Sequence, residues 1–206
     1  ILKLAYDDTV DKGMAWVLAR MVIHVRRYPG NGEEIIVETW PSGVARRVAT
    51  RDFRLIDGKG DVIAVAQSFW VMFDLLERRA ASWPDWIEER LPKPPGPKLI
   101  EPPFRPPFTT DPLPEIDSIK ARPSDLDLYG HVNNVRLMQW VLGATGADAK
   151  PDFQPESIDI QFRTECRVHE RVKVRQTNGF SAITRDGDGV DLVRAHVVAR
   201  NQTALA

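Results

Sequence analysis

The chain has 206 residues and a formal net charge of −1, with 28 Lys and Arg residues against 29 Asp and Glu residues. This balance excludes the broad basic field of nucleic-acid-binding proteins, and no apolar run reaches the ~18 residues that a membrane-spanning helix needs. The single cysteine, Cys166, excludes an internal disulfide and a Cys-x-x-Cys metal site. We therefore expect a globular protein of the reducing cytoplasm that binds neither nucleic acid nor membrane.

The first half of the sequence predicts one helix followed by a run of strands. Within residues 9–20, Val10, Met14 and Val17 fall on one helical stripe, and two acids precede them where a helix N-terminus favours negative charge. Residues 75–91, with two tryptophans, predict a short surface helix. Strands are predicted at residues 22–27, 34–40, 46–56 and 62–73, the last two joined by a hairpin turn at residues 57–60.

A proline-rich stretch separates this half from the next. Residues 92–114 hold ten of the sixteen prolines. Because proline lacks the backbone N–H that helices and central strands need, the stretch predicts a stiff, extended linker. The sequence therefore divides into a first domain at residues 1–91, the linker, and a second domain at residues 115–206.

After the linker the same pattern returns. A strand at residues 116–122 and a helix at residues 132–144 precede strands at residues 157–163, 171–177, 180–185 and 190–200. The turn at residues 186–189 repeats the Asp-Gly-x-Gly of residues 57–60, 129 positions earlier. This spacing indicates a duplicated α+β unit whose first copy lacks its leading strand, as a truncated start would produce. One helix followed by several antiparallel strands favours a sheet wrapped around a central helix.

A polar turn lies just before the helix of the second half. It contains a carboxylate, Asp127, an imidazole, His131, and Gly130, which adopts positive φ at little cost. A helix N-terminus presents free backbone N–H groups. A carboxylate, an imidazole and free backbone N–H groups are the groups that acyl transfer requires. A capped helix with an incidental histidine would give the same pattern.

These residues resemble a known family. Residues 125–134, Asp-Leu-Asp-Leu-Tyr-Gly-His-Val-Asn-Asn, are similar to the motif of the hotdog acyl-thioesterases, and the tandem layout resembles the acyl-acyl-carrier-protein thioesterases. Residues 13–20, 51–53 and 162–166 are similar to the same family. The resemblance implies an α+β tandem (double) hotdog, each an antiparallel sheet around a central helix. It further implies hydrolysis of fatty acyl-acyl-carrier protein by a monomer or homodimer, and we expect no cofactor.

The resemblance also implies which residues act. Asp127, His131 and Glu165 match the family's catalytic residues, and Cys166 matches a cysteine once proposed as its nucleophile. The plant enzymes carry Asn two residues before the histidine, where this chain has Tyr129. The asparagine's role is therefore absent, moved or taken by water.

A mechanism can be written from these residues. We expect Glu165 or Asp127 to activate water, His131 to orient the water or hold the carboxylate, and amides near residues 130–132 to bind the oxyanion. Attack by a carboxylate through an anhydride is a further route. Cys166 is the weaker nucleophile because the charge of Glu165 disfavours its thiolate, so Cys166→Ser should leave most activity.

The first half has no counterpart of the Asp-His pair, and the resemblance implies that it shapes the acyl-chain pocket. Candidate pocket residues are Met14, Trp16, Trp40, Phe69, Trp70 and Met72, although plain core packing is the simpler explanation for each of them. An acidic carrier protein should dock on basic residues, for which the candidates are Arg26, Arg27, Arg46, Arg47, Arg51, Arg54, Arg78 and Arg79. An acyl-CoA thioesterase, a non-catalytic acyl-binding hotdog protein and a hotdog dehydratase are the competing interpretations.

Overall fold

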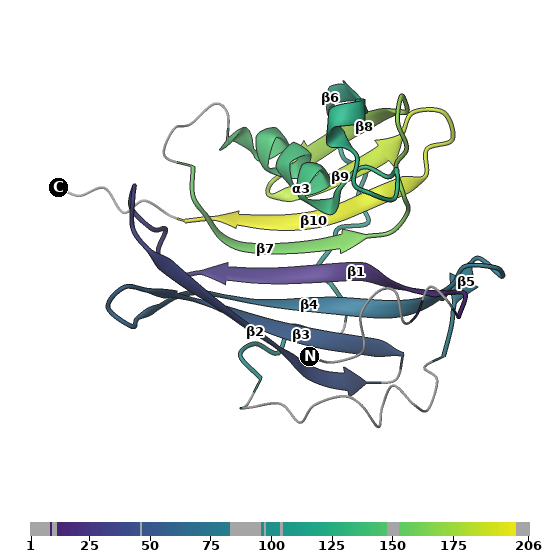
Figure 1. Cartoon of the computed structure of the whole chain (residues 1–206). Coiled ribbons are helices and arrows are strands. Elements are labelled where there is room, and N and C mark those ends of the chain that lie inside the picture. The colour runs from purple at the N-terminus through teal and green to yellow at the C-terminus, as the bar shows by residue number, and fades with distance from the viewer. Residues whose placement is uncertain are drawn as a thin grey trace. The chain divides into compact units, whose positions relative to one another are not determined.

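The computed structural model describes residues 9, 12–45, 47–82, 96, 98–103, 105–147 and 153–200. The chain divides into two compact units, Ile1–Glu101 and Pro102–Ala206, and each unit contains an antiparallel sheet (Figure 1). The division falls inside the predicted linker, whose described residues form neither helix nor strand. None of the helices in the described ranges has the length and apolar character needed to cross a membrane.

The sheet of the first unit has the order β2-β3-β4-β1, and a short strand, β5, pairs with β4. Its strands are β1 (Met14–Val25), β2 (Ile35–Ala45), β3 (Val48–Asp57), β4 (Val62–Asp74) and β5 (Arg79–Ala80). The predicted strands are therefore confirmed here, and the predicted turn at residues 57–60 joins β3 to β4.

The predicted helix at residues 9–20 is wrong from Met14 onward, because these residues belong to β1. The strand pairs with β4 along its whole length, so ladder hydrogen bonds outweigh the helical spacing. A register shift between Leu18 and Arg20 interrupts the strand's alternation. The bulge hides the period of two that would otherwise mark a strand. Val17, on the predicted apolar stripe, is 40% exposed.

The predicted surface helix at residues 75–91 is also wrong where the structure describes it. Residues 75–78 form a turn in which Asp74 Oδ1 accepts the amides of Leu76 and Glu77, each at 2.9 Å. The chain then returns as β5. Trp83 and Trp86 lie outside the described residues.

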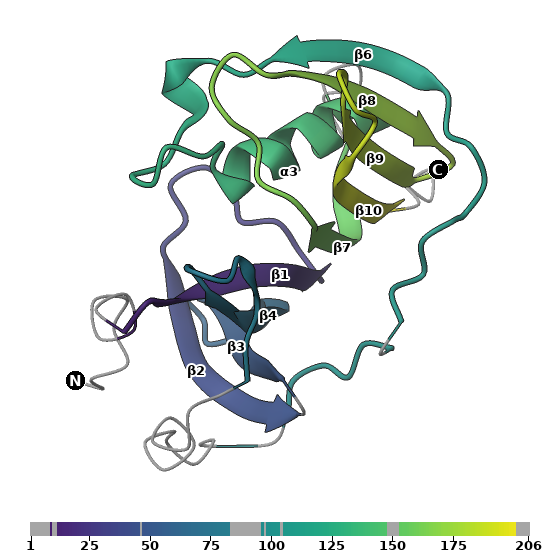
Figure 2. The ribbon, with the colours of Figure 1, turned by 90° about the vertical axis from the view of Figure 1, so that its right-hand side faces the viewer.

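The second unit contains a helix and a sheet of order β7-β10-β9-β8-β6, which curves around α3 (Figure 2). Its elements are β6 (Glu115–Lys120), the 3₁₀ turn η1 (Pro123–Asp125), α3 (Asn134–Leu142), the π turn η2 (Gly143–Ala147), β7 (Pro155–Phe162), β8 (Arg171–Thr177), β9 (Phe180–Arg185) and β10 (Asp191–Ala199). All the strands predicted for this half are confirmed. The helix starts two residues later than predicted, because Asn133 is its N-cap and accepts the Val135 amide at 2.8 Å.

The strands of the two units repeat one topology. In the first unit the order is second, third, fourth and first strand, and β8-β9-β10-β7 reproduces that order in the second unit. The equivalent hairpin turns lie between β3 and β4 and between β9 and β10. The duplication inferred from those two turns is therefore confirmed for the four strands.

The core of the second unit fixes α3 against the sheet. Leu137 and Val141 lie one helical turn apart and are at most 2% exposed, and α3 contacts β9 and β10. Ile183 on β9 and Val193 on β10 are fully buried. Each such aliphatic side chain contributes roughly 1.5–3 kcal/mol by leaving water, so the sheet holds the N-terminal end of α3 in place.

A buried carboxylate ties the linker to the first unit. Asp52 on β3 is fully buried. Its Oδ1 accepts from Ser42 Oγ at 2.6 Å and from Gln67 Nε2 at 2.7 Å, and its Oδ2 accepts the amide of Leu99 at 3.0 Å. These donors compensate for the lost hydration of the carboxylate, so the linker is fixed to the sheet at Leu99.

The turn between β8 and β9 gives a test of the fold. Gly179 has a φ of +82°, and a Cβ there would approach the Val197 carbonyl oxygen to 2.5 Å. We expect Gly179→Ala to lower the free energy of unfolding by at least about 2 kcal/mol. Gly187→Ala, at a position with open space, is the control and should change it by less than about 0.5 kcal/mol. Equal effects in urea denaturation would contradict the assigned turn.

Candidate active site

The polar turn at residues 127–131 is closed by its own backbone. Asp127 Oδ1 accepts the amides of Tyr129 at 2.9 Å and His131 at 3.3 Å, and the Asp127 amide donates to the His131 carbonyl at 2.8 Å. Gly130 supplies the positive φ, +78°, that the turn requires. The Asp127 carboxylate therefore shapes the loop from which the imidazole projects.

The same loop is fixed to the segment that follows β7. The amide of Val132 donates to the Cys166 carbonyl at 2.7 Å, and His131 forms a β-bridge with Arg167. Two regions more than thirty residues apart in the sequence are thereby aligned side by side. This register pairs residue 131 with residue 167, two positions after Glu165 on the same segment.

His131 and Glu165 are in contact. His131 Nε2 lies 3.0 Å from Glu165 Oε2, and the two side chains are 38% and 33% exposed. His131 Nδ1 makes no hydrogen bond within the described ranges. The 3.0 Å separation is short enough for an N–H on Nε2 to donate to the carboxylate, and in that tautomer Nδ1 is the hydrogen-bond acceptor. Of the three predicted site residues, these two touch each other, and Asp127 contacts His131 through the His131 backbone.

Three charged residues that the sequence did not single out surround this pair. Arg167 NH2 lies 2.7 Å from Glu165 Oε1. Arg185 NH2 donates to the backbone carbonyl of Glu165 at 2.9 Å, and its Nε donates to Glu170 Oε2 at 3.2 Å. Burial alone would lower the pKa of Arg185, but hydrogen bonds to Asp188 and Glu170 outweigh it and raise that pKa.

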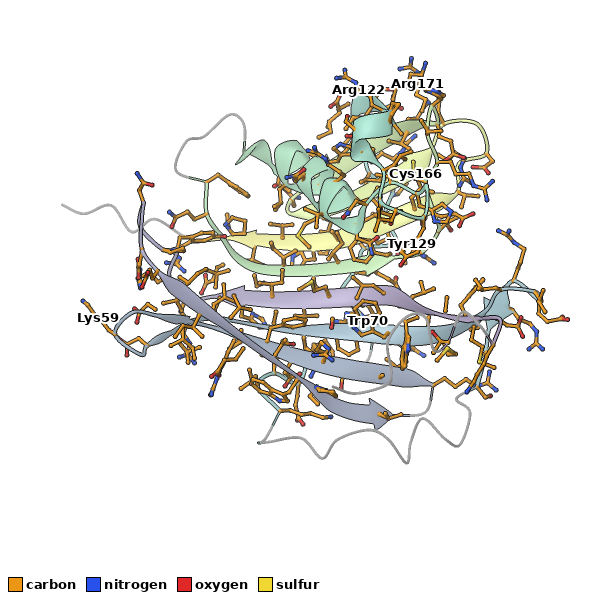
Figure 3. All side chains as sticks on the ribbon, in the orientation of Figure 1. Lys59, Trp70, Arg122, Tyr129, Cys166 and Arg171 are labelled. Carbon is orange, nitrogen blue, oxygen red and sulfur yellow. The ribbon has the colours of Figure 1, made fainter. Side chains whose placement is uncertain are left out.

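The cysteine next to Glu165 is enclosed. Cys166 is fully buried, and Figure 3 shows it among the side chains of the second unit. Burial raises the pKa of its thiol to about 12, and the nearby Glu170 carboxylate adds to the effect. The thiolate that nucleophilic attack would require is therefore disfavoured at neutral pH, as predicted, but through burial and Glu170 instead of the charge of Glu165.

The predicted oxyanion donors are wrong. The amides of Gly130 and His131 donate to the carbonyl and to the carboxylate of Asp127, and that of Val132 donates to the Cys166 carbonyl. These bonds close the loop, so the three amides are already hydrogen-bonded within the protein. The backbone N–H of Asn134, the first residue of α3, makes no such bond in the described part of the chain.

A hollow adjoins this helix end. It has a volume of about 530 Å³ and is lined by Leu126, Asp127, Leu128, Tyr129, Asn133 and Asn134. Tyr129, which Figure 3 labels, is 55% exposed. Its backbone amide is held by Asp127, and its ring is presented on the loop. The hollow is therefore bounded by a helix N-terminus on one side and by the polar loop on the other.

The predictions for the first unit have mixed outcomes. Among the candidate pocket residues Met72 is fully buried, while the other five are half-buried, so their pocket role stays a prediction. Three candidate docking arginines are paired within the unit: Arg27 with Glu33 and Asp57, Arg54 with Glu38, and Arg79 with Glu77. These pairs reduce the positive charge available to a partner. Arg46 lies outside the described residues.

Comparison with known proteins gives a consistent family. Residues 2–91 match the acyl-ACP thioesterase N-terminal domain, and residues 111–202 match the acyl-ACP thioesterase C-terminal domain. A palmitoyl-acyl carrier protein thioesterase of Cuphea hookeriana is 29% identical over 94% of this chain and 50% of its own length. Oleoyl-acyl carrier protein thioesterase 2 of Arabidopsis thaliana is 32% identical over 77% of this chain and 46% of its own length. The chain spans about half the length of these chloroplastic relatives.

Solved structures show the same fold. An acyl-ACP thioesterase from Bacteroides thetaiotaomicron superposes with a TM-score of 0.81 at 22% identity, covering 97% of this chain and 82% of its own. The 12:0-ACP thioesterase from Umbellularia californica gives a TM-score of 0.79 at 22% identity, covering 94% and 78%. The predicted hotdog fold is confirmed, and two hotdog domains are consistent with the matched N- and C-terminal domains.

The burial of Cys166 predicts an unreactive thiol. At pH 8 a free cysteine with its usual pKa near ~8.5 is partly thiolate, whereas a thiol with a pKa of about 12 is almost entirely protonated. We expect iodoacetamide to label the native protein at least about 100-fold more slowly than the protein unfolded in urea. Equal labelling rates, followed by mass spectrometry, would contradict the enclosed thiol.

Proposed function

The chain belongs to the acyl-ACP thioesterase family, and on that premise we propose that it hydrolyses fatty acyl-acyl-carrier protein, releasing a free fatty acid and ending chain elongation. The observation that carries the proposal is the 3.0 Å contact between His131 Nε2 and Glu165 Oε2. It lies within the segment that matches the family's C-terminal domain. The relatives named above act on acyl-carrier substrates, which supports the same substrate class here.

The pair of His131 and Glu165 supplies the general base. Water loses a proton to His131 Nδ1 while its oxygen bonds to the thioester carbon, and Glu165 stabilises the resulting imidazolium through Nε2. The carbon–sulfur bond then breaks, and the departing thiolate takes the proton back from the imidazolium. A thiol with a pKa of ~8.5 is a good leaving group, so this step needs little help from an acid. The products are the fatty acid and the free carrier thiol.

The oxyanion needs a separate donor. We assign it to the backbone N–H of Asn134, which lines the hollow and lies at the N-terminus of α3. The positive end of the helix dipole favours the negative charge that develops on the carbonyl oxygen. The nine-residue helix is anchored by its buried face, so this amide is held in a fixed direction.

The proposal is tested with acyl-carrier-protein and matched acyl-CoA substrates over a range of chain lengths. We expect thiol release with the carrier substrates, and His131→Ala should lower kcat by roughly 10²- to 10⁴-fold because the base is lost. Glu165→Gln should also lower kcat. Asp127→Asn should retain far more activity than Asp127→Ala, because an Asn side chain can accept the same two backbone amides.

The comparison of substrates separates the competing functions. Faster hydrolysis of acyl-CoA would replace the carrier-protein proposal with an acyl-CoA thioesterase. Absence of thiol release from every thioester would favour a non-catalytic acyl-binding protein. A cytoplasmic location and the monomer or homodimer state stay predictions.

The oxyanion assignment has its own test. Asn134→Pro removes the backbone N–H, yet proline suits the first position of a helix, and Asn133 already has a compatible conformation at φ −59° and ψ 137°. We expect kcat to fall by roughly 10²- to 10³-fold with unchanged thermal stability. Asn134→Ala keeps the N–H and is the matched control. Similar kcat values for the two variants would place the oxyanion donor elsewhere.

A further inference from the structure

We propose that Arg167 is a positioning residue that holds the Glu165 carboxylate against His131; this inference rests on the proposed thioesterase function. The two oxygens of Glu165 have different partners. Oε2 faces His131 Nε2 at 3.0 Å, and Oε1 faces Arg167 NH2 at 2.7 Å. The carboxylate is therefore held between the imidazole and a guanidinium.

The contact with Arg167 is the stronger constraint on the orientation of the carboxylate. A glutamate has three rotatable side-chain bonds, and its side chain is 33% exposed here, so burial alone does not fix its rotamer. A charge-assisted N–H···O bond of 2.7 Å is short and about twice as strong as a neutral one. With Oε1 fixed by Arg167, Oε2 is directed at the imidazole.

The backbone around Arg167 is fixed independently of its side chain. Its amide donates to Glu170 Oε2 at 3.0 Å, and the residue forms the β-bridge with His131. Arg185 connects Glu170 to the carbonyl of Glu165. Removal of the guanidinium should therefore leave the segment folded, which makes the side chain's role measurable.

The positive charge of Arg167 also favours the contact between Glu165 and His131. The guanidinium favours the charged form of the neighbouring carboxylate, and a carboxylate is the form that accepts the Nε2–H of His131. Glu165 then orients the imidazole, and Nδ1 is the atom that receives the proton from water. Arg167 acts on the reaction through Glu165 and touches none of the reacting atoms.

Arg163 provides a matched control. It lies two residues before Glu165, as Arg167 lies two residues after it, and both side chains are about half exposed. Arg163 pairs with Asp191 at 3.2 Å, away from Glu165. Arg163→Gln and Arg167→Gln therefore remove the same charge from the same segment, and only Arg167→Gln releases the carboxylate.

The kinetic test compares Arg167→Gln, Arg167→Lys and Arg163→Gln with the wild type on an acyl-carrier substrate. We expect Arg167→Gln to lower kcat by roughly 10- to 100-fold at unchanged KM, because the pair is misaligned while substrate binding is not affected. Arg167→Lys should restore part of kcat, and Arg163→Gln should match the wild type. Equal kcat values for the two glutamine variants, or a loss confined to KM, would overturn the proposal.

Crystal structures of the two glutamine variants give a readout that does not depend on activity. In Arg167→Gln the distance between His131 Nε2 and Glu165 Oε2 should exceed about 3.5 Å, beyond hydrogen-bond range, whereas Arg163→Gln should keep the contact. A wild type that releases no thiol, together with this displacement, would refute the proposed function and leave the positioning role intact. An unchanged contact in Arg167→Gln would refute the positioning role whatever the activity.

Discussion

The register between the loop before α3 and the segment after β7 is the constraint on which the site depends. The Val132 amide bonds the Cys166 carbonyl, and the bridge between His131 and Arg167 continues the alignment. A shift of one residue would turn every side chain of the loop to the opposite face. The contact between imidazole and carboxylate thus follows from backbone hydrogen bonds. The core beneath α3 keeps the loop at the position where those bonds can form.

This constraint changes the interpretation of Asp127. The sequence motif presents Asp127 and His131 as a pair, but the carboxylate accepts backbone amides and closes the loop. A motif records which residue types a loop needs, and it does not separate a side chain that contacts substrate from one that shapes the turn. Aspartate suits both tasks, since its oxygens accept amides two and four residues further along the chain. Only the contacts in the folded structure separate the two roles.

Much of the fold could be predicted from the sequence, because alternation, turn residues and the repeated Asp-Gly-x-Gly are local signals. The strand order repeats between units as the duplication predicts. The failure at β1 has a local cause, the bulge near Leu18, which breaks the alternation and mimics helical spacing. Glu165 entered the site only through the family resemblance, and Arg167 not at all. Their contacts depend on a pairing between distant segments, which no local pattern encodes.

The two units use buried polar groups in opposite ways. Asp52 in the first unit is fully buried, and its oxygens accept three donors, one of them the amide that ties down the linker. Glu165 is one-third exposed and shares its oxygens between an imidazole and a guanidinium. A carboxylate enclosed by neutral donors can only stabilise structure, since neither water nor substrate reaches it. A carboxylate at the surface, aligned with an imidazole whose second nitrogen is open, can take part in proton transfer. The proposed chemistry therefore belongs to the second unit, although both units repeat the same order of four strands.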